Sequence, residues 1–247
     1  MTPADPQSPP SQPVIDSDRT TWPFWGYLDL VLFISIIFPC LLAGALLIKV
    51  VSLGVKIERP IQEMLVQLIA YALIFGALRW MLLLRYGQPF WRSLGWNFRG
   101  RDAILSLMAG PFLAFFLGYL GYMLRAPQIQ SPFDQMLRDT PTLLLFALFA
   151  IIIGPLCEEL AFRGFLMPLL IRSLGAVSGI VITALLFGAL HAPEYSWSWK
   201  HALLVACAGV AFGWTRYRTN STASGAFMHF GFNLTQLVFF VAQARES

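Results

Sequence analysis

The sequence predicts an all-α fold, a polytopic bundle of transmembrane helices, from its composition, its charge content and its hydropathy pattern. Hydrophobic residue types make up 57% of the 247 residues and charged types only 12%, and the mean hydropathy is +0.65. A soluble domain typically has about 25% charged residues, so this chain has too few charges to solvate a globular surface. Soluble, secreted and DNA-binding classes are therefore excluded, and no nucleic-acid partner is expected despite the net charge of +4.

The N-terminal segment differs from the rest of the chain. Residues 1–26 are polar and rich in proline. Such a segment cannot bury enough apolar surface to offset its ordering entropy, so we expect a disordered tail. The remaining chain divides into N-terminal transmembrane helices at 27–130 and a C-terminal region at 131–247, where most polar residues inside apolar windows occur.

Seven windows are long enough to be considered as membrane crossings, each of which needs about 20 largely apolar residues. They lie near 28–51, 62–84, 103–124, 142–162, 174–191, 200–214 and 223–243. The sixth window is short, and 164–173 is a candidate for a separate short helix. The sequence therefore predicts seven or eight spans.

The connection between the third and fourth windows contains two helix-start signals. Ser131-Pro132 precedes Phe133, Met136 and Leu137, a pattern that favours a short helix at the membrane interface. Thr140-Pro141 repeats the signal and predicts the start of the fourth span.

Basic residues predict the orientation of this integral, multi-pass protein, which we expect in a bacterial-type cell membrane. Arginines concentrate after the second and the sixth windows. They are Arg79, Arg85, Arg92, Arg99 and Arg101, then Arg216 and Arg218. With seven crossings, both connections lie on the side of the N-terminus, which places that terminus in the cytoplasm. Lys49, Lys56 and Arg59 favour the opposite orientation.

Ionisable residues inside the windows are the main functional signal, because a charge at the bilayer centre costs several kcal/mol. The fourth window contains Glu158, Glu159 and Arg163. Glu159 and Arg163 have the i,i+4 spacing, acid first, that favours an ion pair, so we expect this pair to be structural. Glu158 points about 100° away from Glu159 and has no local cation. A carboxylate in that position is suited to act as a general base.

Two later windows repeat the i,i+4 geometry. Phe187 and His191 share one face of the fifth window, and His229 and Asn233 share one face of the seventh. Polar groups on three helices need partners inside lipid, so we expect a polar cavity among the C-terminal helices where they share a water or a metal. Glu158, His191 and His229 form a ligand set that suits zinc. Equally, Glu158 and His191 can activate water while His229 and Asn233 bind an oxyanion.

The cysteines support neither a disulfide framework nor a thiolate zinc site, because Cys40, Cys157 and Cys207 lie in apolar stretches without a CxxC pair. Cys157 is a nucleophile candidate, but an apolar setting makes a thiol inert, so a packing role is favoured.

The order EExxxR, FxxxH, HxxxN closely resembles the CPBP family, which contains CAAX prenyl proteases and bacteriocin-processing enzymes and is also called the abortive-infection or type II CAAX endopeptidase family. The matching residues are Glu158, Glu159 and Arg163, then Phe187 and His191, then His229 and Asn233. The resemblance covers about 142–243.

The resemblance implies an intramembrane endopeptidase of about eight helices that hydrolyses a membrane-associated peptide or protein substrate, including lipidated ones. Glu158 and His191 would activate water, and His229 and Asn233 would form the oxyanion site. Glu159, Arg163 and Phe187 would support them. A metal-free mechanism is favoured, since a zinc-bound Glu158 would leave no obvious second carboxylate as base. The alternatives are a zinc-dependent protease or a non-enzymatic immunity or scaffold protein that keeps the cluster for packing.

Overall fold

A computed structural model describes residues 22–127, 129 and 140–246. Every regular element in these residues is helical, which confirms the all-α prediction. In chain order the elements are α1 (Tyr27–Val51), α2 (Arg59–Tyr86), α3 (Phe90–Ser93), α4 (Gly100–Met123), α5 (Thr140–Leu148), the π-helix η3 (Phe149–Ile153), α6 (Gly154–Glu159), the π-helix η4 (Leu160–Leu166), α7 (Met167–Leu174), α8 (Ala176–His191), the 3-10 helix η5 (Ala192–Tyr195), α9 (Trp199–Thr219) and α10 (Thr222–Glu246).

Six helices in the described part of the chain are long and apolar enough to cross a membrane, so seven or eight spans are not confirmed. The expected separate helix at 164–173 is wrong, because α5 to α7 form one continuous apolar helix from Leu143 to Leu174. The sixth window is helical as α9 but is not among the six. Lys200 near its start, with Arg216 and Arg218 in its last turn, lowers its hydropathy.

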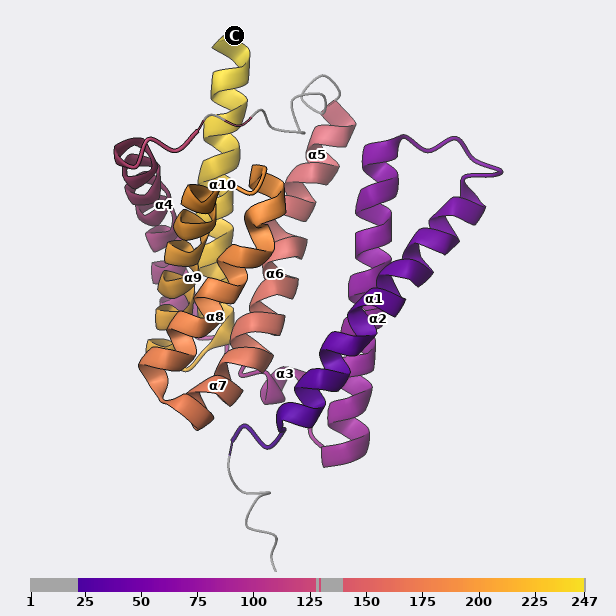
Figure 1. The fold of residues 1–247 in the computed structure, drawn as a ribbon, viewed down its shortest axis with the longest axis vertical. Helices are drawn as coiled ribbons and strands as arrows, with labels where there is room; N and C mark the ends of the chain where they lie inside the picture. The colour runs from indigo at the N-terminus through magenta and orange to yellow at the C-terminus, as the bar shows by residue number, and fades with distance from the viewer. Residues whose placement is uncertain (1–21, 128, 130–139, 247) are drawn as a thin grey trace, which may run out of the picture.

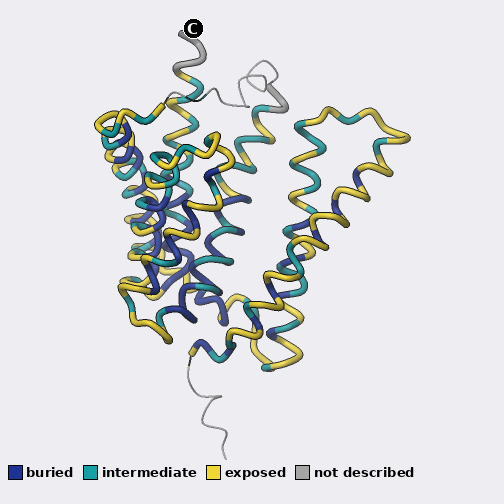
Figure 2. Tube along the Cα trace, viewed as in Figure 1, coloured by how far each residue is buried: buried dark blue, intermediate teal, exposed yellow. Residues whose placement is uncertain are grey.

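The molecule consists of a helical bundle, α4 to α10, with the hairpin of α1 and α2 beside it (Figure 1). The hairpin joins the bundle near the end where the chain enters α1 and diverges from it toward the other end. Buried residues gather in the bundle, whereas much of the hairpin surface is exposed (Figure 2). Apolar exposure of this kind fits a protein whose solvent is lipid.

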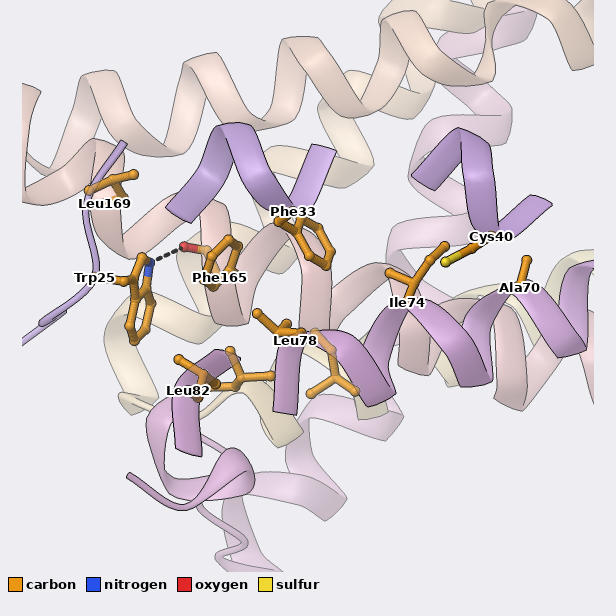
Figure 3. Close-up of a cluster of buried hydrophobic side chains, with 11 residues drawn as sticks. Trp25, Phe33, Cys40, Ala70, Ile74, Leu78, Leu82, Phe165 and Leu169 are labelled. Atoms are coloured by element: carbon orange, nitrogen blue, oxygen red, sulfur yellow. Dashed lines mark hydrogen bonds between the residues drawn. The ribbon is translucent and has the colours of Figure 1, made fainter. Parts of the chain in front are cut away.

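A cluster of buried apolar side chains attaches the hairpin to the bundle (Figure 3). Phe33 from α1 lies 5.0 Å, ring centroid to ring centroid, from Phe165 of η4. Trp25 stacks on Phe165 at 5.2 Å and donates from its indole nitrogen to the Phe165 carbonyl at 3.1 Å. Trp25 is fully buried. The segment 22–26, which the sequence assigns to the disordered tail, is therefore packed in place.

The long helix that carries the glutamates is interrupted by π turns on both sides of α6. Pro155 has no N–H to donate and its ring crowds the carbonyl one turn earlier. Wider π turns are rare inside helices and often mark a functional site. Here η3 ends one residue before Gly154-Pro155. Glu158 and Glu159 follow within the next helical turn.

Glycines allow α10 to lie directly against α4. A Cβ added to Gly110 would lie 2.4 Å from the Phe232 nitrogen, and one added to Gly231 would lie 2.2 Å from the Leu107 carbonyl oxygen. Only hydrogen side chains permit this backbone approach, which is typical of helix pairs in membranes. Because Gly231 lies between His229 and Asn233 in the sequence, this contact also fixes the depth at which those two residues enter the bundle.

Two further predictions depend on the connections. The expected interfacial helix at Ser131-Pro132 lies outside the described residues, whereas α5 begins at Thr140 as expected. The basic connections after α2 and α9 lie at the same end of the bundle as Trp22, since Trp22 bonds to Ser93 and its ring faces Arg216. Which side of the membrane this end faces stays a prediction.

Candidate active site

Three side chains from three helices converge in the bundle. Glu158 comes from α6, His191 from the last residue of α8, and His229 from α10. The Nε2 atoms of His191 and His229 lie 3.8 Å from Oε1 and Oε2 of Glu158, respectively. These distances are too long for direct hydrogen bonds. The Glu158 side chain is 25% exposed, so the cluster is reachable from outside the protein.

The hydrogen bond of His191 fixes its neutral tautomer. Its Nδ1 lies 2.7 Å from the carbonyl oxygen of Phe187, one turn earlier in α8. A carbonyl oxygen can only accept, so Nδ1 carries the hydrogen and donates. Nε2 of the neutral ring is then a bare acceptor that faces Glu158. The FxxxH spacing therefore uses the backbone of Phe187 to orient the histidine.

His229 is also held through its Nδ1 atom, here by a carboxylate. Its Nδ1 lies 3.2 Å from Oε1 of Glu159, and only 5% of the side chain is exposed. Glu159 is ion-paired with Arg163, and its carboxylate oxygen accepts from Nδ1–H, which leaves Nε2 directed at Glu158. The two histidines thus present equivalent atoms to the two oxygens of one carboxylate.

Beneath this cluster lies the ion pair that the i,i+4 spacing predicts. Arg163 Nη1 lies 2.9 Å from Glu159 Oε1, and both side chains are 0% exposed. Arg163 also donates from Nη2 to the carbonyl oxygen of Gly209 in α9, at 3.0 Å. Its guanidinium lies 4.5 Å from the centre of the Phe187 ring and 5.5 Å from that of Phe212. Hydrogen bonding, ion pairing and aromatic faces together compensate the burial of this cation.

Aromatic rings fill the space between the ion pair and the histidines. Phe187 lies 4.4 Å from the His191 ring and 5.9 Å from the His229 ring. Phe212 of α9 stacks on His229 at 4.3 Å with an interplanar angle of 21°. Phe187 and Phe212 are 2% and 0% exposed, so each histidine is held on one side by a fully packed ring.

Asn233 lies apart from the other predicted residues. Its Nδ2 donates to the carbonyl oxygen of Ala150 in η3 at 2.8 Å. Within the described residues it forms no hydrogen bond with Glu158 or either histidine. The π turn frees backbone carbonyls from the regular pattern, and Asn233 satisfies one of them. One of its two amide hydrogens is used in this way, which leaves the other for a different acceptor.

Sequence reasoning missed the contribution of α9 and of one glycine in α10. Gly209 supplies a carbonyl to Arg163, and Phe212 supplies the ring under His229. A Cβ on Gly225 would lie 2.9 Å from Oε2 of Glu159. The spacing of Gly209 and Gly213 on one face of the sixth window was an available signal, since small residues four apart favour close helix contact.

Glu158, His191 and His229 are the residues that the sequence offers as zinc ligands. Among the described residues, no group of three or more His, Cys, Asp and Glu side chains is placed to hold a metal ion. The Nε2 atoms of His191 and His229 face different oxygens of Glu158. A tetrahedral zinc site needs every donor about 2 Å from one shared point.

Comparison with known protein families found a match over the C-terminal part of the chain. Residues 140–235 match the family model described as type II CAAX prenyl endopeptidase Rce1-like. This range contains all the residues of the cluster, from Glu158 to Asn233, and excludes α1 to α4. No curated protein and no solved structure matches the chain. Through residues 140–235, the chain is similar to the type II CAAX prenyl endopeptidase Rce1-like family.

Proposed function

We propose that this protein is an intramembrane endopeptidase in which Glu158 and His191 activate the attacking water. The Rce1-like family suggests intramembrane protease activity in general. The observation that carries the finer proposal is the pair of 3.8 Å separations between Glu158 and the Nε2 atoms of His191 and His229. Each separation exceeds a hydrogen bond, so a bound water at the carboxylate can contact both partners by modest adjustment.

The proton route follows from the fixed tautomers. Glu158 takes a proton from water, and the resulting hydroxide attacks the scissile carbonyl carbon. The proton then passes to the leaving amine as the C–N bond breaks, which returns Glu158 to its starting state. His191 accepts the second hydrogen of the water at its bare Nε2 and holds the water in line. The products are a new carboxylic acid end and a free amine.

His229 and Asn233 are proposed to stabilise the oxyanion. Nε2 of His229 can donate only when Nδ1, which is bonded to Glu159, also carries hydrogen. The oxyanion role therefore requires a hydrogen on both ring nitrogens of His229, and the adjacent Glu159 carboxylate compensates the resulting charge. The free amide hydrogen of Asn233 is the second donor. Asn233 would have to move relative to the Ala150 carbonyl for this amide hydrogen to reach the oxyanion.

The substrate class is a membrane-associated peptide or protein, and a peptide with a prenylated C-terminal tail is the first to test. The described helices place apolar surface around the cluster, which suits a substrate that arrives from the lipid. We propose a metal-free reaction, because a zinc-bound Glu158 would leave Glu159 as the other glutamate of the cluster, and Glu159 is already paired with Arg163.

The decisive experiment measures cleavage in proteoliposomes. A farnesylated reporter peptide and the same peptide without the lipid are incubated with wild type, Glu158→Gln and Glu63→Gln. Glu63 is an exposed glutamate in α2 whose ion-pair partner among the described residues is Arg59, one turn away, so it controls for the chemical change. We expect cleavage by wild type and Glu63→Gln and none by Glu158→Gln. Equal cleavage by all three proteins would remove Glu158 from the mechanism, and no cleavage by wild type of either peptide would favour a non-enzymatic role.

A further inference from the structure

A second polar feature lies at the end of the bundle where the chain enters α1. A pocket of about 460 Å³ opens between the end of α7, the end of α9 and the N-terminal segment. Trp22, Ile171, Arg216 and Arg218 are among the residues that line it. Its nearest residue on the long helix, Met167, follows Glu158 by nine positions, which is about 14 Å along a helix axis. The pocket is therefore separate from the candidate active site.

Arg216 is the unusual residue of this pocket. Only 3% of it is exposed. Its Nε donates to the Thr222 hydroxyl at 3.0 Å, and its Nη1 donates to the side-chain oxygen of Asn220 at 3.1 Å. Nη2 has no hydrogen-bond partner although it is buried. Nη2 lies close to Gly95: a Cβ added to that glycine would be 2.7 Å from Nη2. Neutral acceptors therefore hold the guanidinium in one position and leave a donor unused.

The contrast with Arg163 shows what Arg216 lacks. Arg163 is equally buried but has the carboxylate of Glu159 at 2.9 Å. Within the described residues, Arg216 forms no ion pair with any carboxylate. An arginine stays protonated in proteins, and a buried cation without a counter-ion is costly. An anion from outside the protein would supply the missing charge.

The surroundings add positive charge and aromatic surface. Arg218 lines the same pocket and is exposed; its guanidinium faces the Trp214 ring at 5.7 Å. Arg172, on α7, donates to the carbonyl oxygens of Pro23 and Trp25, and no carboxylate among the described residues pairs with it. Trp22, 45% exposed, covers Arg216 at 5.2 Å. Clustered arginines with aromatic rings at a helix end are typical of the membrane–water interface.

We propose that the pocket lined by Arg216 and Arg218 binds a phosphate group, carried by an anionic phospholipid headgroup or free in solution. Guanidinium groups match the geometry of phosphate oxygens, and an anion in the pocket beside Arg216 and Arg218 would offset the buried charge. The headgroup source is favoured because the pocket lies at the ends of apolar helices. This inference does not rest on the proposed peptidase activity.

The test measures thermal unfolding of the purified full chain in detergent micelles. The added ligand is phosphatidylglycerol, phosphatidylcholine or inorganic phosphate, and native mass spectrometry counts bound lipids. We compare wild type with Arg216→Gln, Arg218→Gln and Arg101→Gln. Arg101 is an exposed arginine at the start of α4 and does not line the pocket, so it controls for loss of one positive charge.

We expect phosphatidylglycerol at ten times its Kd to raise the Tm of wild type and Arg101→Gln by about 3–6 °C more than phosphatidylcholine does. The difference should vanish in Arg216→Gln and shrink in Arg218→Gln, with one fewer bound lipid in the mass spectra. Because Arg216→Gln can fail to fold, Arg218→Gln by itself decides the location. An equal shift with inorganic phosphate would identify free phosphate as the source. Equal effects of both lipids without a phosphate effect, or a phosphatidylglycerol effect unchanged in Arg218→Gln, would overturn the proposal.

Discussion

Two adjacent glutamates lie in very different surroundings. Glu159 is 0% exposed, forms an ion pair with Arg163 and accepts a hydrogen bond from His229, so its charge is balanced inside the protein. Glu158 is 25% exposed and has two histidine nitrogens at 3.8 Å, neither close enough to bond it directly. A balanced carboxylate holds a structure together, whereas an accessible and incompletely bonded one is free to react. Adjacent residues of a helix point about 100° apart, and this change of direction produces the difference.

The largest effects are expected when each of the two glutamates, in separate variants, is replaced by glutamine. Glu158→Gln should lower the cleavage rate at least about 100-fold, the range of a lost general base, while Tm stays within about 2 °C of wild type. Glu159→Gln should leave Arg163 buried without its counter-charge and lower Tm strongly. Cleavage assays and thermal unfolding of both proteins check this. A Glu159→Gln protein with wild-type Tm would show that the two carboxylates do not divide their roles as the burial suggests.

Arg163→Ala tests whether the buried Glu159–Arg163 ion pair stabilises the fold. Breaking a buried pair typically costs about 3–5 kcal/mol, so the free energy of unfolding should fall by about that amount and activity should fall with it. The double variant Glu159→Gln with Arg163→Met removes both charges and should recover much of the lost stability. Chemical unfolding in mixed micelles measures both. If Arg163→Ala unfolds like wild type, the pair is not structural, and a substrate contact becomes the better account of Arg163.

Gly225→Ala should have a smaller effect, on both the stability that Glu159 supports and the activity that depends on His229. The added Cβ would lie 2.9 Å from Oε2 of Glu159, so the carboxylate must shift and His229 with it. We expect a loss of about 1–3 kcal/mol in stability, together with lower activity. Gly118→Ala in α4 is the matched control, because its Cβ would meet nothing within 4 Å. Unchanged stability and activity in Gly225→Ala would show that Glu159 moves without consequence for His229.

Metal removal should have the smallest effect. If Glu158 acts as a base without a metal, dialysis against a chelator should change the cleavage rate less than about twofold, and elemental analysis should find no stoichiometric zinc. Added zinc should inhibit, by binding His191 and His229. Near one zinc per chain, with activity lost on its removal and restored on its return, would contradict the metal-free mechanism.

The residues of the cluster could be identified from sequence because the membrane makes each charge conspicuous. Glu158, His191 and His229 interrupt apolar windows, and polar groups in lipid must find one another. The Glu159–Arg163 pair followed from helical spacing alone. The partners that orient the histidines were less visible. A backbone carbonyl such as that of Phe187 leaves no mark in the sequence, and neither does the way Phe212 stacks on His229.

The number of membrane-spanning helices, in contrast, could not be predicted from the sequence alone. Hydropathy windows ended the fourth span at 162 and left 164–173 as a candidate for a separate short helix, on either side of Arg163. In the folded protein that arginine is fully buried against Glu159 and Gly209, so the helix continues through it as a π turn. A window average treats Arg163 as solvated and has no means of detecting a partner from another helix.

The sequence by itself determined the all-α membrane class, the chemical types that meet in the cluster and the buried pair, since these depend on composition and on the fixed 3.6-residue period of the helix. Only the tertiary structure decided that Asn233 bonds the Ala150 carbonyl, that α9 completes the core, and that Arg216 has no counter-charge among the described residues. These features depend on contacts between segments distant in the chain. Their positions follow from how the helices pack, and local sequence patterns do not encode that packing.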